Sequence, residues 1–214
     1  MKAAIFDLDG TLIDSMWLWK ELANKYLLSI GITPPEDLRE SLKELSLLEA
    51  CNYMKDRFKI QKTAKKINSE MEDILSNYYA KEFQLKPYVL DTLRKLKEKN
   101  IRMCLATATE DRLVLLALDR LEIRDYFEFI QTCNNTGLGK WQKEFFQLAI
   151  DRLQIDPEDI WVFEDALHCI ISAKKCGLNV VGIYDDSAIE DMDSIKELVD
   201  IYIKDFSQLE VESL

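Results

Sequence analysis

The sequence predicts an α/β fold in which a parallel sheet forms the core and a helical segment is inserted after the first strand. Short apolar runs recur along the chain and each is followed by a helical pattern, which is typical of parallel strands covered by helices on both faces. Residues 15–83 break this alternation, because they show helical periodicity and no convincing strand. We therefore expect a Rossmann-like core made of residues 1–14 and 84–214, with residues 15–83 as a helical cap.

Six apolar runs are the expected strands, and the third of them is the weakest. They span residues 3–6, 101–106, 127–131, 160–163, 180–184 and 201–203. Helices are expected between them at about residues 88–99, 110–121, 141–153 and 166–176. Gly177 stands where the last of these helices would stop, and Pro87 and Pro157 stand near helix starts.

The expected cap holds about four helices, with a break at residues 31–35, where a glycine and two prolines occur. A helical bundle that leaves and rejoins a sheet near its carboxyl edge is well placed to act as a lid, with hinges near residues 14–15 and 84–87. On the first cap helix, Trp19 shares an apolar stripe with later residues, so we expect it in the core of the cap. Trp17 lies on the opposite side and is the better candidate for facing a cleft.

The composition limits the partners of the protein. Its 28 basic and 39 acidic residues give a net charge of -11, which repels nucleic acid and anionic membranes, so neither is expected as a partner. A small anionic ligand is still compatible with this net charge, because local cations or a bound metal can make one cleft positive. The five cysteines are scattered without a Cys-x-x-Cys pair, and neither a secretory signal nor a bilayer-spanning apolar run is present. These features predict a soluble protein of the reducing cytoplasm.

The first strand ends in two carboxylates that are one residue apart, Asp7 and Asp9, and Gly10 lets the chain turn away after them. Two acids this close in a partly buried place repel each other unless a cation lies between them. Such a pair suits a hard metal ion with oxygen ligands, such as Mg2+. It also suits a division of roles in which one carboxylate attacks and the other moves protons.

Three more polar clusters follow later segments, and ligands of open parallel sheets bind at the carboxyl ends of strands. Thr107 and Thr109 end the second strand, where a hydroxyl beside a helix start can hold phosphate oxygens or simply cap the helix. Lys140 lies in a glycine-containing turn at a helix start, where it serves a ligand or is a solvated surface residue. Glu164 and Asp165 end the fourth strand, as further metal ligands or as an acidic helix N-terminus.

Two other features are interpreted as solvated. His168 is the only histidine and follows the acidic pair by one helical turn, which favours an exposed helix position over a role beside the site. Asp185 and Asp186 end the fifth strand and are interpreted as a solvated turn.

Together, the four polar clusters resemble the motifs of the haloacid dehalogenase superfamily. The resemblance is to the branch that inserts a helical cap after the first strand, represented by β-phosphoglucomutase and phosphoglycolate phosphatase, and it covers essentially the whole chain. Three motifs stand clearly, in residues 7–11, at Thr107 and at Glu164 with Asp165. The remaining motif normally reads Lys-Pro, whereas Lys140 is followed here by Trp141, and Lys143 lies one helical turn further on.

The resemblance implies phosphoryl transfer. Asp7 would attack phosphorus and form an aspartyl-phosphate, while Asp9 would protonate the leaving oxygen and then activate the water that hydrolyses the intermediate. The resemblance further implies Mg2+ bound by Asp7, Asp165 and the backbone carbonyl of Asp9, with Glu164 in support.

The same resemblance assigns the phosphoryl oxygens of the substrate to Thr107, the N–H of Ala108 and Lys140. The expected function is therefore a Mg2+-dependent phosphatase for a small phosphorylated metabolite, acting as a monomer or a weak homo-oligomer.

Three rival functions are weighed against this one. A phosphosugar mutase is the runner-up, but relatives of that kind carry a histidine in place of Trp19 and often a valine in place of Thr11, so both residues favour hydrolysis. That histidine also points to Trp19 as the residue facing the cleft, so the choice between the two tryptophans stays open. A dehalogenase is disfavoured because that branch lacks the acid at Asp9. A catalytically silent binding protein is a remote alternative, because Asp7, Asp9 and Asp165 are all intact.

Overall fold

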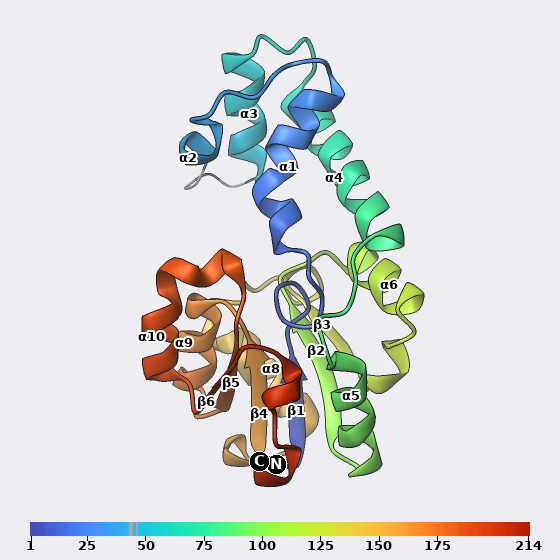
Figure 1. The fold of residues 1–214 in the computed structure, drawn as a ribbon, viewed down its shortest axis with the longest axis vertical. Coiled ribbons are helices and arrows are strands. Elements are labelled where there is room, and N and C mark those ends of the chain that lie inside the picture. The colour runs from blue at the N-terminus through green and yellow to red at the C-terminus, as the bar shows by residue number, and fades with distance from the viewer. Residues whose placement is uncertain (43–44, 46) are drawn as a thin grey trace. The chain divides into compact units, whose positions relative to one another are not determined.

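The computed structural model describes residues 1–42, 45 and 47–214, which form two compact units. The first unit comprises Met1–Met16 and Phe83–Leu214, and the second comprises Trp17–Glu82. Figure 1 shows the first unit as a sheet flanked by helices and the second as a group of helices. No helix within the described ranges combines the length and the apolar character needed to cross a membrane.

The six expected strands form one parallel sheet, as predicted (Figure 1). In spatial order they are β3 (Ile130–Thr132), β2 (Arg102–Thr107), β1 (Ala3–Phe6), β4 (Ile160–Glu164), β5 (Asn179–Ile183) and β6 (Ile201–Ile203). Strand β1 is central, and its last residue, Phe6, is aligned with Leu105 of β2 and Phe163 of β4. The carboxyl ends of β1, β2 and β4 therefore lie side by side.

Helices connect these strands. They are α5 (Val89–Glu98), α6 (Asp111–Arg120), α7 (Cys133–Thr136), α8 (Lys143–Leu153), α9 (Leu167–Lys175) and α10 (Met192–Leu198). Short 3-10 turns lie at Arg124–Tyr126, Pro157–Asp159, Asp186–Asp191, Phe206–Gln208 and Val211–Ser213. The four predicted helices correspond to α5, α6, α8 and α9, whereas α7 and α10 were not predicted.

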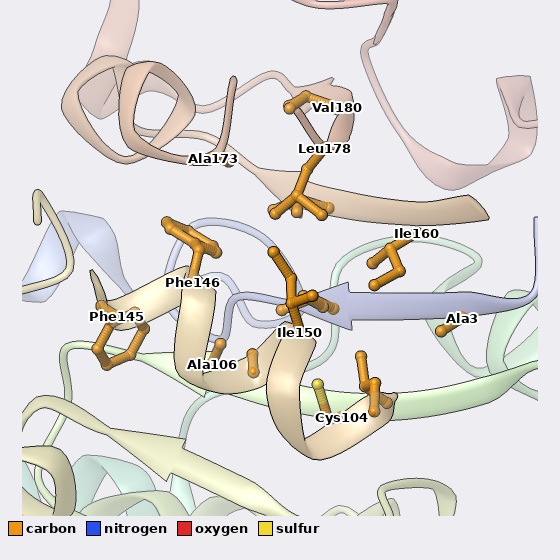
Figure 2. Packing of buried hydrophobic residues seen from close by; sticks show 14 of the residues in the cluster. Ala3, Cys104, Ala106, Phe145, Phe146, Ile150, Ile160, Ala173, Leu178 and Val180 are labelled. Carbon is orange, nitrogen blue, oxygen red and sulfur yellow. The ribbon is translucent and has the colours of Figure 1, made fainter. Parts of the chain in front are cut away.

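One face of the sheet packs against α8 and α9. Small strand residues such as Ala3, Cys104 and Ala106 leave room for Phe145 and Phe146 of α8, and all five are fully buried (Figure 2). Successive strand residues point to opposite faces of the sheet, so every second residue of a strand contributes to this cluster. All members of the cluster are apolar. The other face carries a row of aromatic rings, in which Phe6 stacks on Phe163 with ring centroids 4.4 Å apart.

Two element boundaries differ from the prediction by two residues or more, and the others agree to within one residue. The third strand begins at Ile130 and not at Phe127, because a 3-10 turn ends beside Phe127, whose ring packs edge-on against Phe6. Helix α8 begins at Lys143, with Gln142 as its N-cap, so Lys140 lies in the preceding turn and not at the helix start. Both differences arise where a turn replaces the regular continuation of an apolar pattern.

The second unit holds the four helices expected in this part of the chain, which are α1 (Met16–Ser29, in this unit from Trp17 onward), α2 (Leu38–Leu42), α3 (Leu47–Arg57) and α4 (Ala64–Lys81). Its core includes Leu18, Leu22 and Tyr26 of α1, which recur at four-residue spacing. The expectation that Trp19 lies in this core is wrong, because Leu18 occupies the buried position and Trp19 is only half-buried. Trp17 is 43% exposed and meets the ring of Tyr78 edge-on.

Candidate active site

The predicted site residues of the first unit gather at the carboxyl edge of the sheet. Asp7 directly follows β1, Thr107 ends β2, and Glu164 ends β4, which are three adjacent strands. The backbone N–H of Asp7 donates to the carbonyl of Phe163 at 3.0 Å, so the first acid is fixed beside the end of β4. Lys140 reaches the same place from the turn before α8.

Lys140 is the buried cation of this cluster. Its ammonium is ion-paired with Asp7 and lies 2.6 Å from Oε2 of Glu164, and only 2% of the residue is exposed. The interpretation of Lys140 as a solvated surface residue is therefore wrong. The other oxygen of Glu164 accepts hydrogen bonds from the N–H groups of Asp165 and Ala166 at the start of α9, which fixes its orientation.

Asp165 is held from two sides. The hydroxyl of Thr11 donates to its Oδ1 at 2.9 Å, and both residues are buried. Gly10 adopts a left-handed conformation with φ of 81°, and a Cβ there would lie 2.7 Å from Cγ of Asp165. Glycine is thus required at position 10 both by its backbone conformation and by the close approach of this carboxylate.

The three carboxylates can share one cation. Asp7, Glu164 and Asp165 each offer an oxygen, and these oxygens lie within 4.8 Å of one another. All three residues are buried, so their mutual repulsion is poorly screened by water. Hard oxygen donors in this number fit Mg2+ with water completing its shell.

Burial shifts the protonation of these groups. The pKa of Asp7 is raised to about 7, chiefly by burial and further by Glu164 and Asp9, against the opposing effect of Lys140. The pKa of Asp165 is raised well above its ordinary value by burial and by the neighbouring carboxylates. Burial alone would lower the pKa of Lys140, but Asp7 and Glu164 outweigh it and raise that pKa, so the ammonium stays charged.

Asp9 is held by two hydroxyls. Ser15 donates to its Oδ1 and Thr109 donates to its Oδ2, each at 2.5 Å. The two donors come from either side of the site, one after β1 and one after β2. Together they fix the plane of a carboxylate that is only partly buried. Sequence reasoning missed both partners, since a hydroxyl that follows a strand by a few residues carries no distinctive pattern.

The end of β2 contributes Thr107, which is almost fully buried, and the exposed Ala108. Neither threonine caps α6, because the N-cap is Glu110 and makes no side-chain cap bond. The Thr107 hydroxyl oxygen instead accepts the N–H of Thr109 at 3.2 Å, which tightens the turn after the strand. The capping interpretation is therefore wrong for both residues.

Of the two features interpreted as solvated, the structure confirms one and contradicts the other. His168 is exposed on α9, as expected. Asp185 is not solvated: its carboxylate is buried and pairs with the ammonium of Lys86 at 2.8 Å. The linker residue Lys86 was not predicted as a partner, because it lies far from Asp185 in the sequence.

Comparison with known proteins links this geometry to a family. A family model described as haloacid dehalogenase-like hydrolase matches residues 4–183. A phosphorylated carbohydrates phosphatase from Thermotoga maritima is 28% identical over 178 residues, which cover 83% of this chain and 82% of the relative.

Two further relatives have names that point to a different reaction. A β-phosphoglucomutase from Bacillus subtilis is 28% identical, over 86% of this chain and 83% of its own length. A solved structure from Thermotoga maritima, provisionally assigned as a β-phosphoglucomutase, superposes with a TM-score of 0.82 at 26% identity, over 95% of this chain and 94% of that one.

Proposed function

The chain belongs to the haloacid dehalogenase-like hydrolase family, and on this premise we propose that it is a Mg2+-dependent phosphatase for a small phosphorylated metabolite. The strongest support is the buried group of Asp7, Glu164, Asp165 and Lys140 at the carboxyl edge of the sheet. Relatives named as phosphatases support hydrolysis of a phosphoric monoester as the reaction.

Asp7 is the proposed nucleophile. It follows the central strand directly, so its backbone is rigid and its carboxylate has a fixed direction. In the proposed reaction one of its oxygens attacks phosphorus, the bond from phosphorus to the leaving oxygen breaks, and an aspartyl-phosphate remains. The Lys140 ammonium, paired with Asp7, favours the ionised form that this attack requires.

Asp9 is the proposed proton carrier. It would give a proton to the leaving oxygen and then take one from the water that hydrolyses the aspartyl-phosphate. Its hydrogen bonds from Ser15 and Thr109 support this role, because they hold the carboxylate in one orientation.

The phosphoryl oxygens of the substrate are assigned to Thr107, the N–H of Ala108 and the ammonium of Lys140. Support comes from the position of Thr107 at the end of β2, the strand next to the one that carries Asp7.

Asp7, Glu164 and Asp165 are the side chains that would hold Mg2+, with the backbone carbonyl of Asp9 as a further donor. The close spacing of their oxygens and their burial fit this ion. When bound, Mg2+ supplies positive charge that lets an anionic nucleophile approach an anionic phosphate.

The test is release of phosphate from p-nitrophenyl phosphate by the purified protein. Turnover is expected with Mg2+, and it should stop with EDTA and return with excess Mg2+. Asp7→Asn should abolish it, whereas Asp151→Asn, which removes an exposed carboxylate on α8, should not. Absence of turnover with every divalent metal tested would refute the proposal that the protein is an enzyme. A screen of phosphorylated metabolites then identifies the substrate, whose selection we assign to residues 15–83.

A phosphosugar mutase is the second candidate, because two relatives bear the name β-phosphoglucomutase. Trp19 and Thr11 argue against it, since mutases of this kind carry a histidine and often a valine there. Incubation with β-glucose 1-phosphate separates the two functions. Free phosphate as the main product supports the phosphatase, and glucose 6-phosphate as the main product supports the mutase.

A further inference from the structure

A buried ion pair lies beside the proposed metal site and has no role in the proposed reaction. The ammonium of Lys86 contacts Oδ2 of Asp185 at 2.8 Å and donates to the carbonyl of Tyr184 at 2.8 Å. The two charged side chains are only 10% and 8% exposed. Such burial is uncommon for a lysine or an aspartate and occurs where the charge has a partner.

Short connections place this pair next to Asp165. Strands β4 and β5 are neighbours with Glu164 aligned to Gly182, so Asp165 and Asp185 both follow the carboxyl ends of adjacent strands. Neighbouring strands lie about 4.8 Å apart. From the other side, Thr11 donates to Asp165 while the carbonyl of the next residue, Leu12, accepts the N–H of Lys86 at 2.9 Å.

The charges of the pair act on the acidic cluster. Both groups interact electrostatically with Asp165: the carboxylate of Asp185 repels its negative charge, and the ammonium of Lys86 attracts it. Asp185 itself has a lowered pKa, because hydrogen bonds from Lys86 and Ser187 outweigh its burial. A positive and a negative charge are thus held together where water screens them little, because both side chains are about nine-tenths buried.

We propose that Lys86 and Asp185 are positioning residues that set the charge around Asp165 and thereby the affinity of the acidic cluster for a divalent cation. This inference rests on the proposed function, since it assumes that the cluster binds Mg2+. The pair also ties the linker at residues 84–86 to two other segments, because Lys86 donates to the carbonyl of Tyr184 after β5 and to the carbonyl of Leu12 after β1.

The test is calorimetric titration of the metal-free protein with Mg2+ alone, without substrate. Lys86→Met leaves Asp185 as an extra negative charge and should tighten the Mg2+ dissociation constant by about threefold or more. Asp185→Asn leaves Lys86 as an extra positive charge and should weaken it by a similar factor of about three. The double variant should return to within about twofold of the wild type, because both charges are gone.

Controls separate charge from structure. Lys86→Arg keeps the charge and should keep the dissociation constant. The ion pair of Lys2 and Asp159, which lies at the amino ends of β1 and β4, serves as a control. Lys2→Met and Asp159→Asn should leave the Mg2+ dissociation constant unchanged. Where Lys86→Met lowers the folded fraction, Lys86→Gln removes the same charge with a side chain that can still donate a hydrogen bond, and it should likewise tighten the dissociation constant.

Opposite shifts in the two single variants support the inference. Shifts in the same direction, or none, overturn it, because a purely structural pair would weaken binding in both variants. If the wild-type protein binds neither Mg2+ nor Mn2+, the proposed function fails and takes the inference with it.

Discussion

Replacing Asp7 by asparagine is expected to make the metal-free protein more stable above neutral pH while removing its activity. Asp7 is 6% exposed, and burial raises its pKa to about 7 even though Lys140 pairs with it. Its ionisation is therefore less favourable in the folded protein than in the unfolded chain, where water surrounds the carboxylate.

The magnitude follows from the shift of the Asp7 pKa from 3.8 to about 7. Each pKa unit corresponds to about 1.4 kcal/mol, so complete titration lowers the free energy of unfolding by about 4 kcal/mol. Because the folded state holds the proton more tightly, this stability is fully present below the unfolded pKa and is lost as pH rises through the folded one. Roughly 2.5 kcal/mol of the loss falls between about pH 5 and about pH 8.

Urea unfolding in EDTA, followed by circular dichroism at these two pH values, measures the effect. The wild type should lose roughly 2.5 kcal/mol more between them than Asp7→Asn, because Asp165, whose pKa is also raised, titrates in both proteins and cancels in the comparison. Carboxyls whose pKa is lowered, such as Asp111 and Glu128, change stability only at more acidic pH. Excess Mg2+ near pH 8 should stabilise the wild type more than Asp7→Asn, since the variant lacks one ligand.

The matched control is Asp151→Asn, which removes an exposed carboxylate from the same unit. It should follow the wild type at both pH values. Equal pH-dependent losses in Asp7→Asn and in the wild type would show that ionisation of Asp7 does not determine the stability of the metal-free protein. The reasoning from burial would then be refuted.

Three further substitutions test the other parts of the site. Asp9→Asn should slow steady-state phosphate release by about 100-fold or more, because proton transfer is lost, and an unchanged rate would exclude Asp9 as the proton carrier. Thr11→Val keeps the shape but removes the hydrogen bond to Asp165, so the free energy of unfolding should fall by about 1–3 kcal/mol in urea titrations, and a neutral result would show that this bond contributes nothing. Lys140→Met leaves Glu164 without its cation and should destabilise the fold by about 3–5 kcal/mol near neutral pH, whereas equal stability of the two proteins would contradict the buried pair.

The sheet was predictable because its strands are buried on both faces and read as continuous apolar runs. The parallel arrangement of the strands could be inferred without knowledge of side-chain packing, because a helical pattern separates successive apolar runs. The site acids were predictable for a related reason. Asp7 and Glu164 interrupt apolar runs abruptly at strand ends, where a charge is unfavourable without a role.

The supporting contacts were not predictable, because they depend on which loops approach one another. Thr11, Ser15 and Thr109 look like ordinary turn residues, yet each donates to an acid of the site. Asp185 looked solvated because it lies in an acidic turn, and only the approach of Lys86 from the linker makes its burial tolerable. The prediction for the core of the second unit was wrong for a similar reason, since the buried stripe of α1 includes Leu18 and not Trp19.

The charge balance of the carboxyl edge favours a divalent ion over a monovalent one. Asp7, Glu164 and Asp165 carry three negative charges when ionised and Lys140 carries one positive charge, which leaves an excess of two in a buried place. Without an added cation, part of this excess is relieved by protonation, as the raised pKa values of Asp7 and Asp165 indicate. A protonated carboxyl is a poor nucleophile, so in the proposed reaction the burial that raises the pKa of Asp7 would also keep the metal-free protein inactive. A bound divalent cation would remove the repulsion and the need for the proton together, and for this reason the pH dependence of stability and that of turnover should both respond to Mg2+.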